Sequence, residues 1–157
     1  MATPIGHTAI GIALARRLGV RSPLGTGAAV VAASLPDIDV IAGLILHRDA
    51  WKLHRKGTHT LGFALSAGML AGFAGIVSAE SIEGERDLVM DAMTGALLVA
   101  SHLVLDKLPF PYLPTKKEMP NAVVARNEII NWLLDALVYG AVAWRLMPKD
   151  SRAPAAA

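Results

Sequence analysis

Apolar residues gather into five long stretches along this chain, separated by shorter polar segments. They span roughly residues 5–18, 24–46, 61–79, 88–108 and 129–147. Their apolar positions follow helical spacing, and the sequence contains neither a strand-like alternation of any length nor an internal repeat. The pattern predicts an all-α fold, a bundle of about four to five helices.

The composition indicates that this bundle lies in a membrane. The hydrophobic share of 54% exceeds the soluble norm of about 45–50%, and the charged share of 18% falls below the usual ~25%. The mean hydropathy of +0.46 agrees. Residues 61–79 carry no charge and are long enough, at ~1.5 Å per residue, to cross a hydrocarbon core about 30 Å thick. We expect an integral membrane protein; a soluble helical bundle with a large core is the alternative.

The remaining composition narrows the classes of function. The chain has no cysteine, which excludes disulfides and thiolate metal ligands. The net charge of +2 is too small to argue for nucleic acid, and we expect no such partner. We also expect no cleavable signal peptide, because the first residues lack a basic segment and an unbroken apolar core. By size we expect one membrane-embedded domain at 1–150, then a disordered tail at 151–157.

Charges between the stretches predict a topology. The segments after the second and fourth stretches are basic, whereas residues 80–87 are mainly acidic. Because basic loops face the cytoplasm, the third and fourth stretches should form a hairpin with cytoplasmic ends and an acidic outer tip. The second stretch has basic flanks on both sides and is interrupted by Pro36. It either dips into the membrane and returns, with a break at 36–39, or crosses against the charge rule.

Three motifs place ionisable residues inside apolar sequence. They are LPDID at 35–39, HRKGTHT at 54–60 and SHLVLD at 101–106. Ionisable groups are costly among apolar neighbours and therefore need partners or a purpose. Histidine and aspartate are common ligands of divalent metals, and without thiolates the donors must be nitrogen and oxygen. The motifs predict a metal site, and the hairpin brings 59, 102 and 106 to one end.

Spacing within the motifs suggests how ligands are presented. His102 and Asp106 are four apart on a predicted helix, so both project from one face and can share a metal. The alternative is a surface ion pair or a buried hydrogen-bonded pair. Asp37 and Asp39 can present two carboxylates from an irregular segment, with a turn and a helix N-cap as the alternative.

The basic motif contains two histidines of different expected roles. His54 and His59 are five apart, a spacing that does not share a helical face, so at most one should be a ligand, and we favour His59. His54, Arg55 and Lys56 are expected to bind an anionic substrate group. The alternative is that these basic residues only set the topology.

In this order, the three motifs resemble the YdjM-like family of predicted membrane-bound metal-dependent hydrolases, whose best-known member is described as LexA-regulated. An early histidine, His7, and the proline-containing stretch at 109–114 also fit, and the resemblance spans about residues 4–130. There are two departures. Lys56 stands where the family usually has glycine, and Thr60 stands where serine is common; neither removes a ligand.

A more distant similarity is to the helical zinc-dependent phospholipase C and nuclease fold. The order His, Asp, His, His-x-x-x-Asp is matched by His7, Asp37, His59, His102 and Asp106. In that fold such residues bind clustered zinc ions and hydrolyse phosphodiesters.

The resemblance and the residues together predict a metal-dependent hydrolase acting on phosphate esters, lipid head groups among them, near the cytoplasmic face of the inner membrane. A metal-bound water would attack the ester, with Asp39 or Glu128 as base. Zinc is the expected ion, with manganese and magnesium as alternatives. The predicted metal ligands are His7, Asp37, Asp39, His59, His102 and Asp106.

Two other classes of function stay open. An ion or proton transporter would spread ionisable residues across the bilayer depth, and Asp91 and Asp135 lie within apolar stretches. A non-catalytic membrane adaptor would use a structural metal with a closed coordination sphere.

Overall fold

The computed structural model describes residues 3–20, 22–73, 88–108, 112–115 and 118–149. Within these ranges it is all-helical and contains no strand, as the apolar pattern predicts. The tail at 151–157 and residues 74–79 of the third stretch lie outside the described residues. The helices are α1 (Pro4–Arg17), α2 (Pro23–Ser34), the 3₁₀ turn η1 (Leu35–Asp37), α3 (Ile38–His47), α4 (Leu61–Phe73), α5 (Leu88–Lys107) and α6 (Asn121–Leu146).

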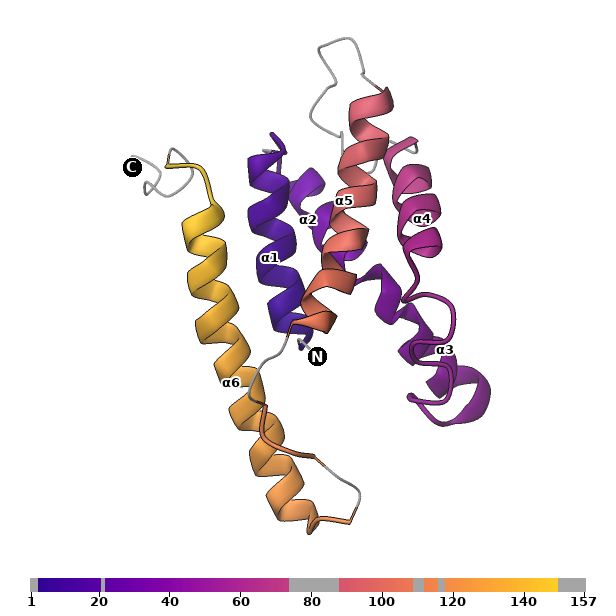
Figure 1. Ribbon diagram of the computed structural model, residues 1–157, viewed down its shortest axis with the longest axis vertical. Helices are drawn as coiled ribbons and strands as arrows, with labels where there is room; N and C mark the ends of the chain where they lie inside the picture. Colours follow the sequence, from indigo (N-terminus) through magenta and orange to yellow (C-terminus); the bar gives the residue numbers. More distant parts are fainter. Residues whose placement is uncertain (1–2, 21, 74–87, 109–111, 116–117, 150–157) are drawn as a thin grey trace.

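The second apolar stretch is divided at Pro36 into α2, η1 and α3. Leu35 keeps a right-handed helical conformation, but Pro36 has no backbone N–H to donate to the carbonyl four residues earlier, so the α-helical hydrogen-bond pattern is interrupted there. Figure 1 shows α3 leading away from α2 instead of folding back alongside it. The chain therefore bends at this point without reversing, and the bend carries Asp37 and Asp39.

The last helix is longer than the sequence pattern predicts. We expected an apolar stretch from residue 129, but α6 begins at Asn121, directly after Pro120. The first turns of α6 contain polar residues, so the helical spacing of apolar positions is not visible in this part of the sequence. Asn127 and Asn131 are nevertheless buried, because they face the preceding segment of the chain.

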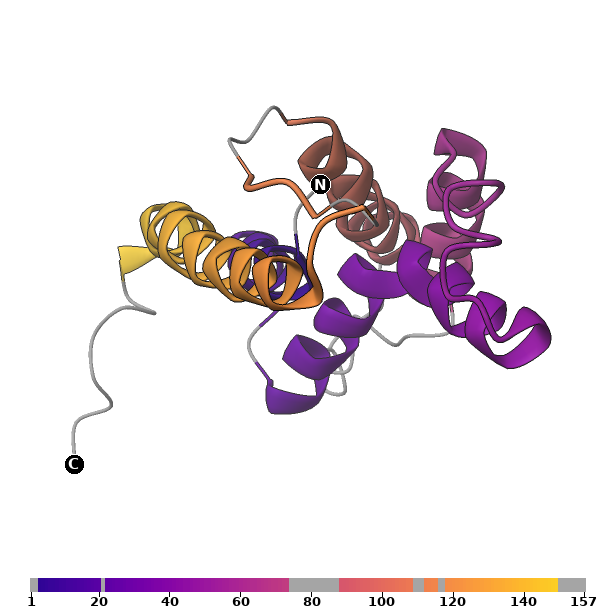
Figure 2. The same cartoon turned by 90° about the horizontal axis from the view of Figure 1, so that it is seen from below.

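Helix α1 packs against α2, α5 and α6, and α5 in turn packs against α2 and α4. In two views α6 lies at one side of the bundle and α4 at the other (Figures 1 and 2). Helices α4 and α5 approach very closely: a Cβ added at Gly95 would lie 2.1 Å from the carbonyl oxygen of Gly68. Small residues at such contacts are typical of helix pairs in membranes.

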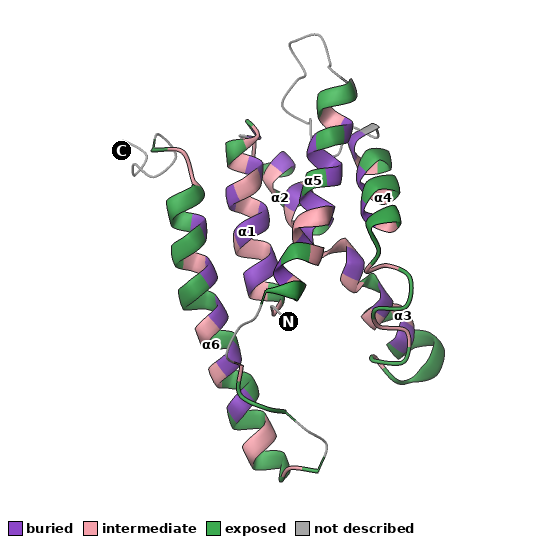
Figure 3. Cartoon of the chain, viewed as in Figure 1, coloured by how far each residue is buried: buried purple, intermediate pink, exposed green. Residues whose placement is uncertain are grey.

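Among the described residues, three segments are long and apolar enough to cross a membrane: Pro23–His47, Val89–Lys107 and Asn121–Leu146. The shorter apolar helix Leu61–Gly72 lies beside the second of these. Broad exposed faces run along α4 and α6 (Figure 3), and they carry large apolar side chains such as Leu70 and Leu137. Apolar surface on this scale fits a lipid environment and agrees with the composition.

Candidate metal centre

The end of α5 supplies a histidine whose tautomer is set by its neighbour. His102 is buried, and its Nδ1 lies 2.9 Å from the carbonyl oxygen of Ala33 on α2. Because a carbonyl can only accept, Nδ1 carries a proton. Nε2 is then left with a lone pair when the ring is neutral, which is the usual arrangement of a metal-binding histidine.

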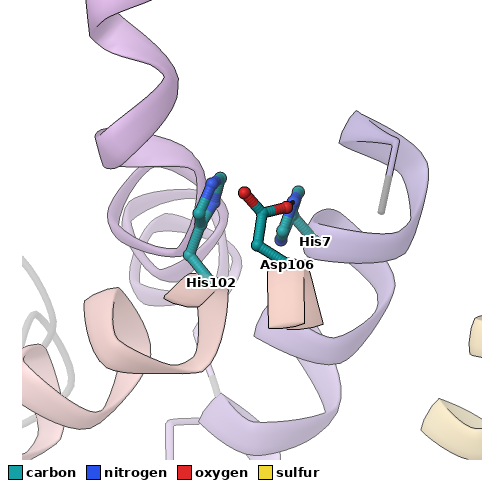
Figure 4. A group of neighbouring side chains, drawn as sticks. All are labelled: His7, His102 and Asp106. Carbon is teal, nitrogen blue, oxygen red and sulfur yellow. Dashed lines mark ion pairs between the residues drawn. The ribbon is translucent and has the colours of Figure 1, made fainter. Parts of the chain in front are cut away.

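Helix α1 brings His7 against this ring. The two imidazoles stack with centroids 3.6 Å apart, and His7 Nε2 lies 3.5 Å from Asp106 Oδ1. Figure 4 shows the Asp106 carboxylate beside both rings, with His102 and Asp106 coming from the same face of α5. The i, i+4 spacing therefore does place the pair together, and His7 joins it from another helix.

His59 links the loop before α4 to this group. Its Nε2 lies 3.2 Å from His102 Nε2, 3.4 Å from Asp106 Oδ2 and 3.6 Å from Asp37 Oδ1. Burial, and next the neighbouring His102, lower the pKa of His59 below its ordinary value. The ring is therefore neutral at pH 7 and can offer its lone pair.

Asp39 holds the loop that carries His59. Its Oδ2 accepts the backbone N–H of Arg55 at 2.9 Å and the hydroxyl of Thr58 at 2.6 Å, while Oδ1 lies 3.0 Å from His54 Nδ1. His59 Nδ1 is also 3.3 Å from Oδ2. A carboxylate that contacts a histidine in this way fixes the direction of the ring's other nitrogen. These contacts favour an anchoring role for Asp39 over that of a general base.

The expectation for His54 needs correction. Its side chain is only 7% exposed and lies edge-on to His59, with centroids 4.7 Å apart, so it is part of the cluster instead of facing substrate. Helical spacing does not apply to this motif, because residues 54–60 form an irregular loop in which Arg55 adopts a left-handed φ of 64°. Both histidines of the motif therefore enter the cluster.

Arg55 and Lys56, the other two residues that were predicted to bind an anionic group, lie in different surroundings. Arg55 donates from Nη2 to Asp106 Oδ2 at 3.0 Å. Lys56 is exposed, and within the described ranges its side chain has no hydrogen bond or ion pair. Glu128, on α6, is also exposed and lies outside the cluster, on the wall of an adjoining cavity.

We call the assembled cluster the His–Asp centre. It comprises His7, Asp37, Asp39, His54, His59, His102 and Asp106. Their ligand atoms form three overlapping groups, each with its atoms within 4.8 Å of one another. The groups are His7, His102 and Asp106; Asp37, His59 and His102; and Asp39, His54 and His59.

The chemistry of the centre fits a divalent cation. Four of its buried atoms have no hydrogen-bond partner among the described residues: His7 Nδ1, Asp37 Oδ1, His54 Nε2 and Asp106 Oδ1. Its three carboxylates have one guanidinium beside them, that of Arg55. Buried polar atoms without a hydrogen-bond partner are costly unless a ligand satisfies them. Nitrogen and oxygen donors suit zinc, manganese or magnesium.

A second buried polar cluster, which sequence reasoning missed, lies on α6. Asn131 bonds both backbone groups of Leu113, at 2.8 and 3.0 Å, and Asn127 donates to the carbonyl of Pro114 at 2.8 Å. Four residues further on, Asp135 accepts the Tyr112 hydroxyl and the backbone N–H of Thr3.

We call Asn127, Asn131 and Asp135 the α6 clamp. Burial, and next the bond to Asp135, raise the pKa of Tyr112, so the phenol stays a protonated donor. Through Thr3 the clamp also holds the residue before α1, one turn from His7. The sequence does indicate this cluster, because polar residues recur at 127, 131 and 135, four residues apart within an apolar helix, and therefore share one helical face.

Fold and site together define a helical membrane protein with a buried centre of histidines and aspartates. The chain matches the family described as YdjM inner membrane protein over residues 1–110, and it belongs to that family. The match covers every residue of the His–Asp centre and ends before the α6 clamp. No curated protein and no solved structure matches the chain. The similarity to the phospholipase C and nuclease fold stays a prediction.

Proposed function

We propose that this protein is a membrane-bound, metal-dependent hydrolase of phosphate esters. The observation that carries the proposal is the convergence of histidine and aspartate atoms from α1, η1, α3, the 48–60 loop and α5 on one cluster of three overlapping ligand groups. Four of these atoms lack a hydrogen-bond partner among the described residues. A purely structural cluster would be expected to satisfy its own polar atoms.

The donors divide naturally into two sets. His7, Asp37, His59, His102 and Asp106 would hold the first ion. Asp39 and His54 would hold the loop or, with His59, a second ion. When bound, a divalent ion lowers the pKa of a water molecule and stabilises charge that develops on the ester. Zinc is the expected ion, with manganese and magnesium as alternatives.

The chain's own residues position the substrate and move the proton. The Arg55 guanidinium, next to Asp106, would bind a phosphoryl oxygen. The orientation of the Arg55 side chain follows from the left-handed backbone conformation of this residue and from the hydrogen bond that its backbone N–H donates to Asp39. Of the two predicted bases, Asp39 already contacts four loop groups, whereas Glu128 is exposed at the cavity that Asp37 borders. We therefore favour Glu128 as the group that takes a proton.

We further propose a multi-pass topology with the centre near the cytoplasmic face. The basic loops that adjoin the centre and the acidic residues at 80–87 support this orientation. Because the chain lacks cysteine, single cysteines can report on sidedness. In intact cells an impermeant maleimide should label Ser81→Cys and leave Lys52→Cys unlabelled; the reverse pattern would place the centre on the outer side.

Turnover of soluble and lipid phosphate esters by purified protein, with the metal varied, tests the activity. Arg55→Gln should reduce turnover by about 10²-fold, because it removes a charge from the reacting group. Lys52→Gln, an exposed cation of the same loop, should stay within about twofold. Bound metal without turnover on any ester would favour the adaptor, and metal-independent ion flux in vesicles would favour the transporter.

A further inference from the structure

We propose that the substrate is a lipid: an amphipathic phosphate ester whose hydrocarbon chain lies in a cavity between α2–α3 and α6. The binding of its phosphate group at the His–Asp centre rests on the proposed function. The cavity has a volume of about 860 Å³. This lies within the range of about 300–1,000 Å³ that is usual for ligand sites. Apolar side chains of α2, η1 and α3 form one wall, and Trp132 of α6 stands on the other; the apolar residues of the first wall include Val30, Val31, Leu35, Ile38 and Ile41.

Asp37 connects this cavity to the His–Asp centre. Its side chain lines the cavity, and its Oδ1 lies 3.4 Å from His102 Nε2. It is also the most exposed carboxylate of the centre, at 25% against 5% for Asp39 and 6% for Asp106. A group bound at the carboxylates is thus accessible from the cavity side.

Most of the cavity lining belongs to two segments that are apolar enough to cross a membrane, Pro23–His47 and Asn121–Leu146. A hydrocarbon chain could therefore enter sideways from the bilayer without passing through water. A small water-soluble ester would leave most of this apolar wall without a matching surface. The apolar wall of the cavity fits the hydrocarbon chain of a lipid phosphate, and the charged His–Asp centre fits its phosphate group.

Photo-crosslinking tests this placement without relying on turnover. The full chain is placed in phosphatidylcholine nanodiscs with Mn²⁺, together with phosphatidic acid that carries a diazirine at the end of one acyl chain. We expect labelled peptides within 23–47 and 121–146, several-fold more strongly than with a diacylglycerol bearing the same chain. Millimolar inorganic phosphate should compete for the head-group end and reduce the labelling. Equal labelling by both probes, or labelling only of α4, would overturn the proposal.

A pair of matched variants sharpens the test. Val31→Trp places an indole in the cavity, whereas Leu24→Trp places the same side chain at an exposed position of α2 outside it. Val31→Trp should lower labelling and long-chain turnover at least about tenfold. Leu24→Trp should leave both the labelling and the turnover of p-nitrophenyl phosphate within about twofold of the wild type.

The two proposals fail in different ways. If p-nitrophenyl phosphate is hydrolysed but Val31→Trp leaves phosphatidic acid labelling and turnover unchanged, the cavity does not take the chain and the hydrolase proposal stands. If labelling follows the expected pattern but no ester is hydrolysed, the lipid site stands and the hydrolase proposal is wrong.

Discussion

Two buried polar clusters lie in the same apolar bundle, and they differ in how completely the chain satisfies them. In the α6 clamp, both polar atoms of Asn127, Asn131 and Asp135 have partners within the described chain. In the His–Asp centre, four buried ring or carboxylate atoms have no hydrogen-bond partner among the described residues. Both clusters consist of residues that are unusual among apolar neighbours. Of these two clusters, the His–Asp centre is therefore the one whose buried polar atoms are available to bind a ligand.

This difference shows why a buried ionisable residue in a membrane protein is ambiguous by itself. Asp135 lies in an apolar helix and so could indicate a transport pathway. The structure instead gives it two donors from backbone and tyrosine, which accounts for it without transport. Asp91 is in the first turn of α5, roughly 22 Å along the helix from Asp106. Neither residue joins the centre.

The largest expected effect is on metal content. His102→Ala removes a donor shared by two of the three ligand groups, so zinc affinity should fall by at least about 10²-fold. Asn131→Ala is the matched control, because it truncates another buried polar residue, in the clamp, and should leave the bound metal unchanged. Elemental analysis of detergent-purified protein measures both. If the two variants retain as much metal as the wild type, the centre is not a metal site.

A smaller effect, on stability, is expected in the clamp. Asp135→Asn keeps the shape but turns an amide NH₂ toward one of the two donors, which should cost about 1–3 kcal/mol of unfolding free energy. Glu128→Gln, an exposed change on the same helix, should alter stability by no more than about 0.5 kcal/mol. Thermal melts in detergent give the comparison. The metal bound per folded Asp135→Asn molecule should equal that of the wild type, and a selective loss of metal would make the clamp part of the centre.

The smallest effect concerns the support of the centre. Thr58→Val removes the hydroxyl that donates to Asp39, so the loop carrying His59 loses one anchor and zinc affinity should fall about tenfold. Thr58→Ser keeps the donor and should restore affinity to within about twofold of wild type. Competition with a zinc chelator measures both constants. Equal affinities for all three proteins would mean that Asp39 does not orient His59 through this bond.

Much of the fold could be predicted from local pattern. The apolar stretches correspond to the observed helices, with one division at Pro36 and an earlier start of α6. The pairing of His102 with Asp106 also follows from local geometry, because residues four apart share a helical face. His54 could not be placed in this way, since its loop has no regular period.

The sequence by itself determined that this protein is helical, that it belongs in a membrane, and that any metal it binds is held by nitrogen and oxygen. Helical period and hydrophobicity are properties of short segments, so no distant contact is needed to read them. Only the tertiary structure decided which polar residues meet. The N–H of Arg55 bonds Asp39 across sixteen residues, and Asp135 bonds Thr3 across 132. Such bonds form only after the helices pack. They satisfy the polar atoms of the α6 clamp, whereas four buried atoms of the His–Asp centre are left without a hydrogen-bond partner among the described residues.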